Sequence, residues 1–376
     1  MAWKLCKGFK LKFNTKLENI KTYETGKPIE LVVREFGINP KDIIKLASNE
    51  NPFGCSQKVK DAVVDIVSKM SLYPDDSMTK LKDALSKRFG VKDENIIIGS
   101  GSDQIIEFAI HAKASSSSKI LINSVTFAMY EIYAKHVGAR IIRTASQHHD
   151  LDEFYKLYQE QKPEIIFLCT PNNPTGDAID AGKLFDFIAK IDTETLVIID
   201  GAYMEYAIGK DVAKKVDPKE LIEKFDNVLY LGTFSKVYGL GGMRVGYGIS
   251  NSKIIKELYK LRPPFNITTL SLEAASVALN DEEFVNKCII SNFEEMKRYE
   301  EFAKEKKIDI IESHTNFVTL CLNSTYNSSQ IAQELLEKGM IIRDLSSYGM
   351  NAIRVTIGKK EQNNRFFELL SEIIQS

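Results

Sequence analysis

One stretch of the sequence gathers residues that could do covalent chemistry, and it reads Thr233-Phe-Ser-Lys-Val-Tyr-Gly-Leu-Gly-Gly-Met-Arg-Val-Gly246. Lys236 follows an apolar run at 227–232 that is typical of a buried strand, so we expect the lysine on a loop at the strand's carboxyl end. Open α/β sheets bind their ligands at that edge. A lysine partly withdrawn from water has a lowered pKa, and its neutral amine can condense with a carbonyl.

The neighbours of this lysine suit a phosphate group. Thr233 and Ser235 supply hydroxyl donors, and Arg244 supplies a forked donor. A lysine taken alone in a polar loop is usually a solvated surface charge, and glycines often mark only turns. The combination at fixed offsets favours a different interpretation, in which Lys236 forms a Schiff base with pyridoxal phosphate.

Other predicted strand ends offer partners for that cofactor. The run 99–103, Gly-Ser-Gly-Ser-Asp, follows a strand and opens a helix, so its backbone N–H groups and the helix dipole would face a phosphate. Asp200 ends the most apolar strand, where a carboxylate is costly unless a cation such as a protonated pyridine nitrogen pairs with it. Phe127 could stack on a pyridine ring or be plain core, and Asn173 lies in a loop that could be only a turn.

Composition sets limits on the function. The chain has 376 residues, which favours two domains, and its net charge of -1 gives no reason to expect nucleic acid as a partner. The five cysteines lack metal-ligand spacing, so we expect no metal site and reduced thiols in a cytoplasmic enzyme. No apolar run approaches the roughly 18 residues that a membrane span needs. The lysine-rich first sixteen residues are interpreted as an amino-terminal arm.

The order of the predicted elements indicates an α/β fold. Apolar strands at 96–99, 119–122, 140–143, 165–169, 196–200 and 228–232 alternate with helical patterns, which is typical of a mostly parallel sheet flanked by helices. The run 244–249 follows too soon for a helical crossover and is predicted to pair antiparallel. Helices at 270–279 and 282–307 and strands near 317–320, 340–343 and 353–357 predict a smaller α+β domain. We expect a large domain at 51–265 and a small domain formed by 1–50 and 266–376.

These motifs, in this order, resemble those of class I and II aminotransferases, the fold-type I enzymes that use pyridoxal phosphate. The resemblance covers the chain from about residue 20 and implies that Lys236 binds the cofactor's aldehyde, that Asp200 keeps the ring nitrogen protonated and that Tyr203 acts beside them. It implies that Asn173 and Tyr203 bond the ring's phenolic oxygen. It also implies a stacking aromatic and a phosphate cradle, made up of Phe127, Ser102, Asp103, Thr233, Ser235 and Arg244.

The resemblance further implies a homodimer with shared active sites, because Tyr73 matches a tyrosine that reaches the phosphate in the neighbouring subunit. One departure is visible. The family's usual Asp-Glu-Ala-Tyr is Asp200-Gly-Ala-Tyr203 here, which leaves the packing of that loop open.

The segment 46–54 (Leu-Ala-Ser-Asn-Glu-Asn-Pro-Phe-Gly), together with Tyr23 and two arginines, is similar to the histidinol-phosphate aminotransferase family, which acts in histidine biosynthesis. That resemblance implies small-molecule substrates: a phosphorylated amino alcohol or amino acid, and a 2-oxo acid. The substrate-binding candidates are Tyr23, Asn51, Arg343 and Arg354, with Asn266 weaker. Paired arginines could serve both a dicarboxylate and a phosphate.

Three other functions share parts of this pattern. An aromatic or broad-range aminotransferase would carry every cofactor residue, and a phosphothreonine-type decarboxylase would have a similar phosphate pocket. A non-catalytic regulatory domain that senses pyridoxal phosphate would ordinarily carry a basic DNA-binding module, and only about twenty residues precede the fold.

Overall fold

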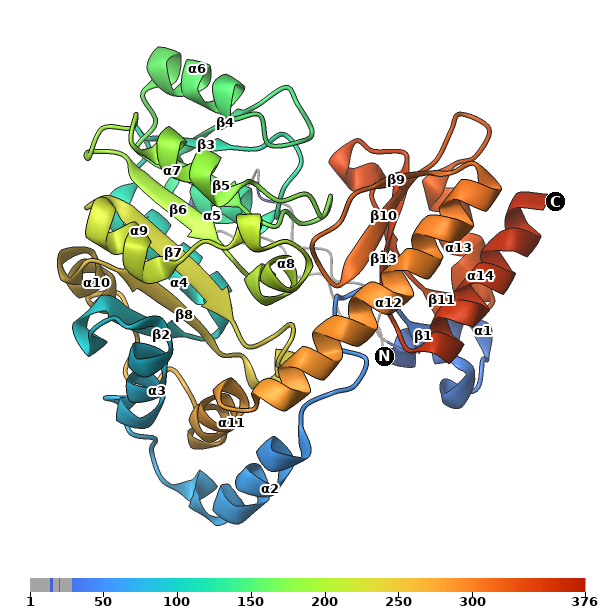
Figure 1. The fold of residues 1–376 in the computed structure, drawn as a ribbon, viewed down its shortest axis with the longest axis horizontal. Coiled ribbons are helices and arrows are strands. Elements are labelled where there is room, and N and C mark those ends of the chain that lie inside the picture. The colour runs from blue at the N-terminus through green and yellow to red at the C-terminus, as the bar shows by residue number, and fades with distance from the viewer. Residues whose placement is uncertain (1–13, 16–19, 21–28, 376) are drawn as a thin grey trace, which may run out of the picture.

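The computed structural model describes residues 14, 15, 20 and 29–375, and its two main sheets each carry their own helices (Figure 1). The longest helix, α12 (Glu282–Lys306), runs between them. The expected amino-terminal arm and Tyr23 lie outside the described residues. Within the described residues, no helix combines the length and the apolar character that crossing a membrane requires.

The larger sheet has seven strands in the order β2-β8-β7-β6-β5-β3-β4. All neighbours pair in parallel except β8, which is antiparallel to both β2 and β7, as the short connection before it predicts. Its strands are β2 (Ile96–Gly99), β3 (Lys119–Ile122), β4 (Arg140–Arg143), β5 (Ile165–Cys169), β6 (Leu196–Asp200), β7 (Val228–Thr233) and β8 (Gly246–Ser250).

Helices cover both faces of this sheet because alternate residues of the apolar strands point to opposite sides. Helices α4, α5 and α10 bury one face. The other face packs mainly against α3, α6, α7, α8, α9 and α11. The helices bounding the larger sheet are α2 (Gln57–Ile66), α3 (Thr79–Phe89), α4 (Gly101–Lys113), α5 (Met129–Val137), α6 (Leu151–Gln161), α7 (Ala181–Ile188), α8 (Met204–Lys210), α9 (Pro218–Lys224), α10 (Ser252–Tyr259) and α11 (Thr269–Leu279).

The smaller sheet is antiparallel, with the order β12-β13-β10-β9, and a short parallel pair, β1 and β11, lies beside it. Its apolar core includes residues of α12, α13 and α14. The remaining elements are α1 (Ile29–Phe36), β1 (Ile44–Lys45), β9 (Asp309–Ile311), β10 (Phe317–Cys321), α13 (Ser328–Glu337), β11 (Met340–Ile341), β12 (Arg343–Asp344), β13 (Ala352–Thr356) and α14 (Lys360–Gln375).

The α/β class with a mostly parallel sheet is confirmed, and two details differ. The single strand predicted at 340–343 is two strands, because residues 340–341 pair with β1 while residues 343–344 pair with β13. Strands β1 and β9 were not predicted. The division at residues 265 and 266 stays a prediction, although contacts of α11 with α2 and α3 favour a larger unit that ends within α12.

Candidate active site

Lys236 lies on the loop between β7 and β8, where backbone hydrogen bonds hold a compact turn. Phe234 N–H donates to the carbonyl of Val245 at 3.0 Å, and Leu240 N–H donates to the carbonyl of Phe234 at 3.0 Å. Burial and, to a smaller extent, the positive charge of Arg354 lower the pKa of Lys236 to about 8. A substantial fraction of this amine is therefore neutral at mildly basic pH, which a nucleophile or general base requires.

Asp200 ends β6 beside this lysine and is only 3% exposed. Its Oδ2 accepts a hydrogen bond from the Tyr130 hydroxyl at 2.6 Å, and its Oδ1 accepts one from Ala202 N–H at 3.1 Å. Burial raises the pKa of Asp200, and these hydrogen bonds offset part of that effect. A buried carboxylate held in this way is suited to a cationic ring nitrogen.

The amino terminus of α4 and the Arg244 guanidinium lie against each other, and both line one cavity. Two glycines allow this close approach, because neither has a Cβ atom that would clash. A Cβ on Gly101 would lie 2.6 Å from Arg244 Nη2, and a Cβ on Gly246 would lie 2.1 Å from the backbone nitrogen of Ser102. Arg244 Nη1 also donates to the Gly241 carbonyl at 3.1 Å, which orients the guanidinium. Backbone N–H groups and a forked cation thus face one point.

Asp103 lies in the first turn of α4 and shows an incomplete set of partners. Its Oδ2 accepts from the Tyr133 hydroxyl at 2.9 Å. Its Oδ1 is buried and has no hydrogen-bond partner among the described residues. Burial raises the pKa of Asp103. A bound group or water that carries a donor would satisfy this oxygen.

Tyr203 also lines the cavity, and a segment distant in the sequence holds it. Asn49 Nδ2 donates to the Tyr203 hydroxyl at 2.8 Å. Arg354, only 7% exposed, donates from Nη1 to Asn173 Oδ1 and from Nη2 to the Ala47 carbonyl at 2.7 Å. Lys236 Nζ lies 5.5 Å from the centre of the Tyr203 ring. The smaller sheet therefore contributes a buried cation to a site that is otherwise built on the larger one.

One cavity brings together ten of the residues expected from the sequence. The individual roles of these residues stay predictions. The cavity is lined by Ser102, Asp103, Phe127, Asn173, Asp200, Tyr203, Thr233, Ser235, Lys236 and Arg244, together with Gly101, Cys169 and Ala202.

Some expected residues do not line this cavity. Arg354 is one of them, although it contacts the lining residue Asn173. Asn51 is turned away from it, because its Nδ2 donates to the Val237 carbonyl at 2.7 Å and holds the lysine loop. Tyr73 is 82% exposed and stacks on Phe265 with ring centres 4.7 Å apart. Arg343 on β12 lies directly opposite Arg354 on β13. The weaker candidate Asn266 donates to Gln104 Oε1 at 2.8 Å and links its loop to α4.

Two residues that contact the site, Tyr130 and Asn49, were not predicted from the sequence. Tyr130 follows Phe127 by three residues, about one helical turn, so a predicted stacking aromatic could have pointed to it. Asn49 lies in the same motif as Asn51 and has φ 54°, a left-handed conformation that asparagine tolerates better than most residues. No pattern in the sequence distinguishes the two asparagines, because the difference arises from contacts with Tyr203 and Val237.

The departure at Gly201 has a packing explanation. A Cβ at this position would lie 2.6 Å from the Tyr230 hydroxyl oxygen and 2.8 Å from Tyr230 Cζ. Tyr230 is buried, so it occupies the space that a larger residue at position 201 would need. Asp200 and Tyr203 keep their places on either side of this glycine, so the altered loop leaves the cavity intact.

Comparison with known proteins identifies the family of this chain. The model of the family described as "Aminotransferase class I and II" matches residues 41–370. Histidinol-phosphate aminotransferase of Sulfurimonas denitrificans is 73% identical over 97% of this chain and 100% of its own length. The enzyme of the same name from Aliarcobacter butzleri is 59% identical over 97% of this chain and 100% of its own length.

Among solved structures, histidinol-phosphate aminotransferase from Sinorhizobium meliloti in complex with pyridoxal-5'-phosphate has the same fold. It superposes with a TM-score of 0.89 at 23% identity and covers 98% of this chain and 99% of its own. The family match spans both sheets and every residue that lines the cavity. The chain therefore belongs to the class I and II aminotransferase family.

Proposed function

We propose that this aminotransferase uses pyridoxal phosphate to transfer an amino group from L-histidinol phosphate to 2-oxoglutarate, yielding imidazole acetol phosphate and L-glutamate in histidine biosynthesis. The observation that carries the proposal is the buried Arg354 beside Lys236, with Arg343 opposite it across two paired strands. Opposed residues of antiparallel strands share one face of the sheet. Two forked cations on one face suit the dicarboxylate and the phosphate that these two substrates carry. Relatives of 73% and 59% identity that bear this enzyme's name support the choice.

The described residues fit the proposed cofactor. The amino terminus of α4 and Arg244 would hold the phosphate, Phe127 would cover the ring, and Asp200 would hold the proton on the ring nitrogen. Asp103 Oδ1 offers an unused buried acceptor in the same cavity. When bound, pyridoxal phosphate supplies the aldehyde that captures the amino group and the ring that accepts electrons from the substrate's α-carbon.

Lys236 is the residue that moves protons in this proposal. With its pKa lowered to about 8, its Nζ can take the proton from the amino-bearing carbon of the donor and return a proton when the acceptor is converted. Tyr203, fixed by Asn49, limits the position of the lysine on one side of the cavity. The same residues serve both halves of the reaction, which predicts ping-pong kinetics.

We also propose that the enzyme is a homodimer in which Tyr73 completes the neighbouring subunit's site. Exposed apolar side chains, here called the patch, lie along α2, in the turn after it and in the loop at 261–265, and Tyr73 stacks on Phe265. Exposed apolar surface is typical of an interface. Asp76 anchors the patch, because Arg262 donates to its two carboxylate oxygens at 2.7 Å each. The exposed members are Val64, Val67, Met70, Leu72, Tyr73, Leu261 and Phe265.

The free thiols Cys55, Cys169, Cys288 and Cys321 support a cytoplasmic location.

Following the cofactor's visible absorbance tests the substrate. The holoenzyme is mixed separately with histidinol phosphate, glutamate, phenylalanine and phosphothreonine. We expect rapid spectral conversion with the first two and little with the others. Conversion by phenylalanine but not by histidinol phosphate would indicate an aromatic aminotransferase, and release of carbon dioxide from phosphothreonine would indicate a decarboxylase. An unchanged spectrum with every amine would fit a sensing domain.

Hybrid dimers test the shared site. A subunit carrying Lys236→Ala is co-expressed with one carrying Tyr73→Phe, and the hybrid is purified with two tags. If Tyr73 serves its neighbour, one site of the hybrid carries both changes and the other carries neither, so about half of the native turnover returns. Turnover no higher than that of the Tyr73→Phe homodimer would place Tyr73 in its own subunit's site.

A further inference from the structure

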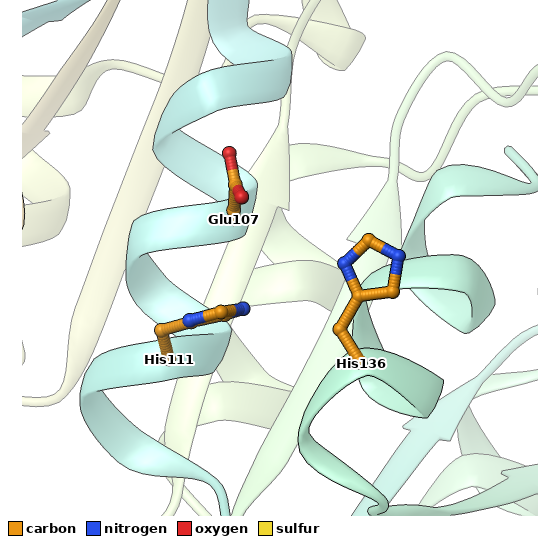
Figure 2. A group of neighbouring side chains, drawn as sticks. All are labelled: Glu107, His111 and His136. Carbon is orange, nitrogen blue, oxygen red and sulfur yellow. The ribbon is translucent and has the colours of Figure 1, made fainter. Parts of the chain in front are cut away.

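A cluster of metal-ligating side chains lies outside the cavity, on helices α4 and α5. Glu107 and His111 are four residues apart on α4, so they share one face of that helix, and His136 comes from α5 (Figure 2). One ligand atom from each residue lies within 4.8 Å of the other two. In Figure 2 the side chains of Glu107 and His111 lie on the side of α4 that faces His136.

We propose that Glu107, His111 and His136 bind a divalent transition-metal ion of the zinc class. Two imidazoles and one carboxylate are a ligand set that suits Zn²⁺ and excludes the oxygen-preferring Mg²⁺ and Ca²⁺. Tetrahedral coordination requires ligand atoms about 3.4 Å apart, so the three atoms must close by about 1.4 Å at most. Rotation of the side chains can supply this movement because His111 is exposed and the other two are half-buried. Water would fill the fourth position.

The position of the cluster gives the ion a structural role. Glu107 lies one helical turn after Asp103, and Asp103 is bonded to Tyr133 of α5 at 2.9 Å. The Tyr133 ring in turn packs edge-on against His136, with centres 5.5 Å apart. A bound ion would therefore fasten α4 to α5 directly behind the helix end that faces the cavity. The proposal does not depend on the substrate, and it differs from the expectation, drawn from the sequence, that the protein has no metal site.

Zinc titration of the untagged, chelator-treated holoenzyme tests the proposal, with a chromophoric chelator as competitor. We expect binding of one equivalent and an increase in melting temperature when Zn²⁺ is present. His111→Ala and His136→Ala should each weaken the affinity at least roughly tenfold, and the double variant should lose the thermal shift. Glu107→Gln, which keeps the size of the side chain, should weaken binding in the same way.

His148→Ala is the matched control, because His148 is an exposed histidine outside the cluster. This variant should bind zinc and melt like the native protein. All variants keep the same cysteines and the same cofactor, so a change confined to the cluster variants identifies the site. The absence of stoichiometric binding to the native protein would overturn the proposal. So would an affinity and a thermal shift that the double variant retains, measured once its zinc-free melting temperature shows that it folds.

Discussion

The residues on the two sides of the cavity are positioned in different ways. On the side of the larger sheet, Asp200 is the last residue of β6 and Lys236 comes three residues after the end of β7, so short local connections bring both to the site. On the other side, Arg354 and Asn49 contact the lining residues Asn173 and Tyr203, which are more than 150 residues away from them in the sequence. In the proposed reaction, the first side places the groups that react, and the second side sets their charge and orientation.

Mutations on the two sides should therefore change different properties of the enzyme. In the proposed reaction, a residue on the local side supplies a reacting atom, so its loss should abolish chemistry. A residue on the distant side acts through its neighbours, so its loss should have a smaller effect, on rate, affinity, pH dependence or stability. Three sets of variants test this separation, from the largest expected effect to the smallest.

Lys236→Met should lower turnover by about 10²–10⁴-fold or more, because it removes the proposed general base. The same change should raise the unfolding free energy of the cofactor-free protein at pH 7 by up to about 3 kcal/mol, since a pKa lowered from 10.5 to about 8 means that the charged lysine destabilises the fold. Turnover is measured by the spectral half-reaction, and stability is measured by urea denaturation.

The gain in stability from Lys236→Met should become smaller as the pH rises. The unfolded lysine binds its proton more tightly than the folded one, so the stability of the native protein should rise between pH 8 and 10.5 through this group. The advantage of Lys236→Met should therefore shrink over that range. Lys253→Met, a change at an exposed lysine, should alter neither turnover nor stability by a comparable amount. A gain for Lys236→Met that stays constant from pH 7 to 10 would contradict the lowered pKa.

Arg354→Met should have two effects that Arg354→Lys separates. Loss of the cation should raise the pKa of Lys236 and move the rising limb of the pH–rate profile to higher pH. Loss of the forked donor should raise KM for glutamate by roughly 10–100-fold. Arg354→Lys keeps the charge, so it should raise KM while leaving the pH profile near its native position. Arg343→Met should leave the profile unshifted, and a shift there equal to that of Arg354→Met would remove the distinction between the two arginines.

Asn49→Ala should mainly lower the rate of catalysis, whereas Asn51→Ala should mainly lower the stability of the fold. Asn49 bonds to Tyr203, so its loss should lower kcat by about tenfold, the effect of one lost hydrogen bond in the site. Asn51 bonds to the Val237 carbonyl, so its loss should lower the unfolding free energy by about 1–3 kcal/mol with little change in KM. Steady-state kinetics and denaturation are measured on both variants. A raised KM for Asn51→Ala with native stability would support the substrate contact expected from the sequence.

The sequence alone predicted most of the larger sheet and the local side of the cavity. Apolar runs flanked by turn residues identify strands such as β5 and β6, and Lys236 and Asp200 follow from their place after such runs. The residues on the other side of the cavity are positioned by contacts between segments that are distant in the sequence. Neither the parallel pairing of β1 with β11 nor the contact of Asn49 with Tyr203 has a signal within its own segment. Tyr130 was missed because an aromatic residue in a helix gives no indication of whether its hydroxyl meets a carboxylate.

The contact between Gly201 and Tyr230 bears on how position 201 can be substituted. A Cβ at position 201 would lie 2.6 Å from the tyrosine's hydroxyl oxygen, and Tyr230 is buried. Glutamate, the family's usual residue at this position, would therefore require Tyr230 to shift or to be replaced by a smaller side chain. In a protein engineered to carry both changes, the replacement of Tyr230 should come first, because the reverse order crowds the two side chains.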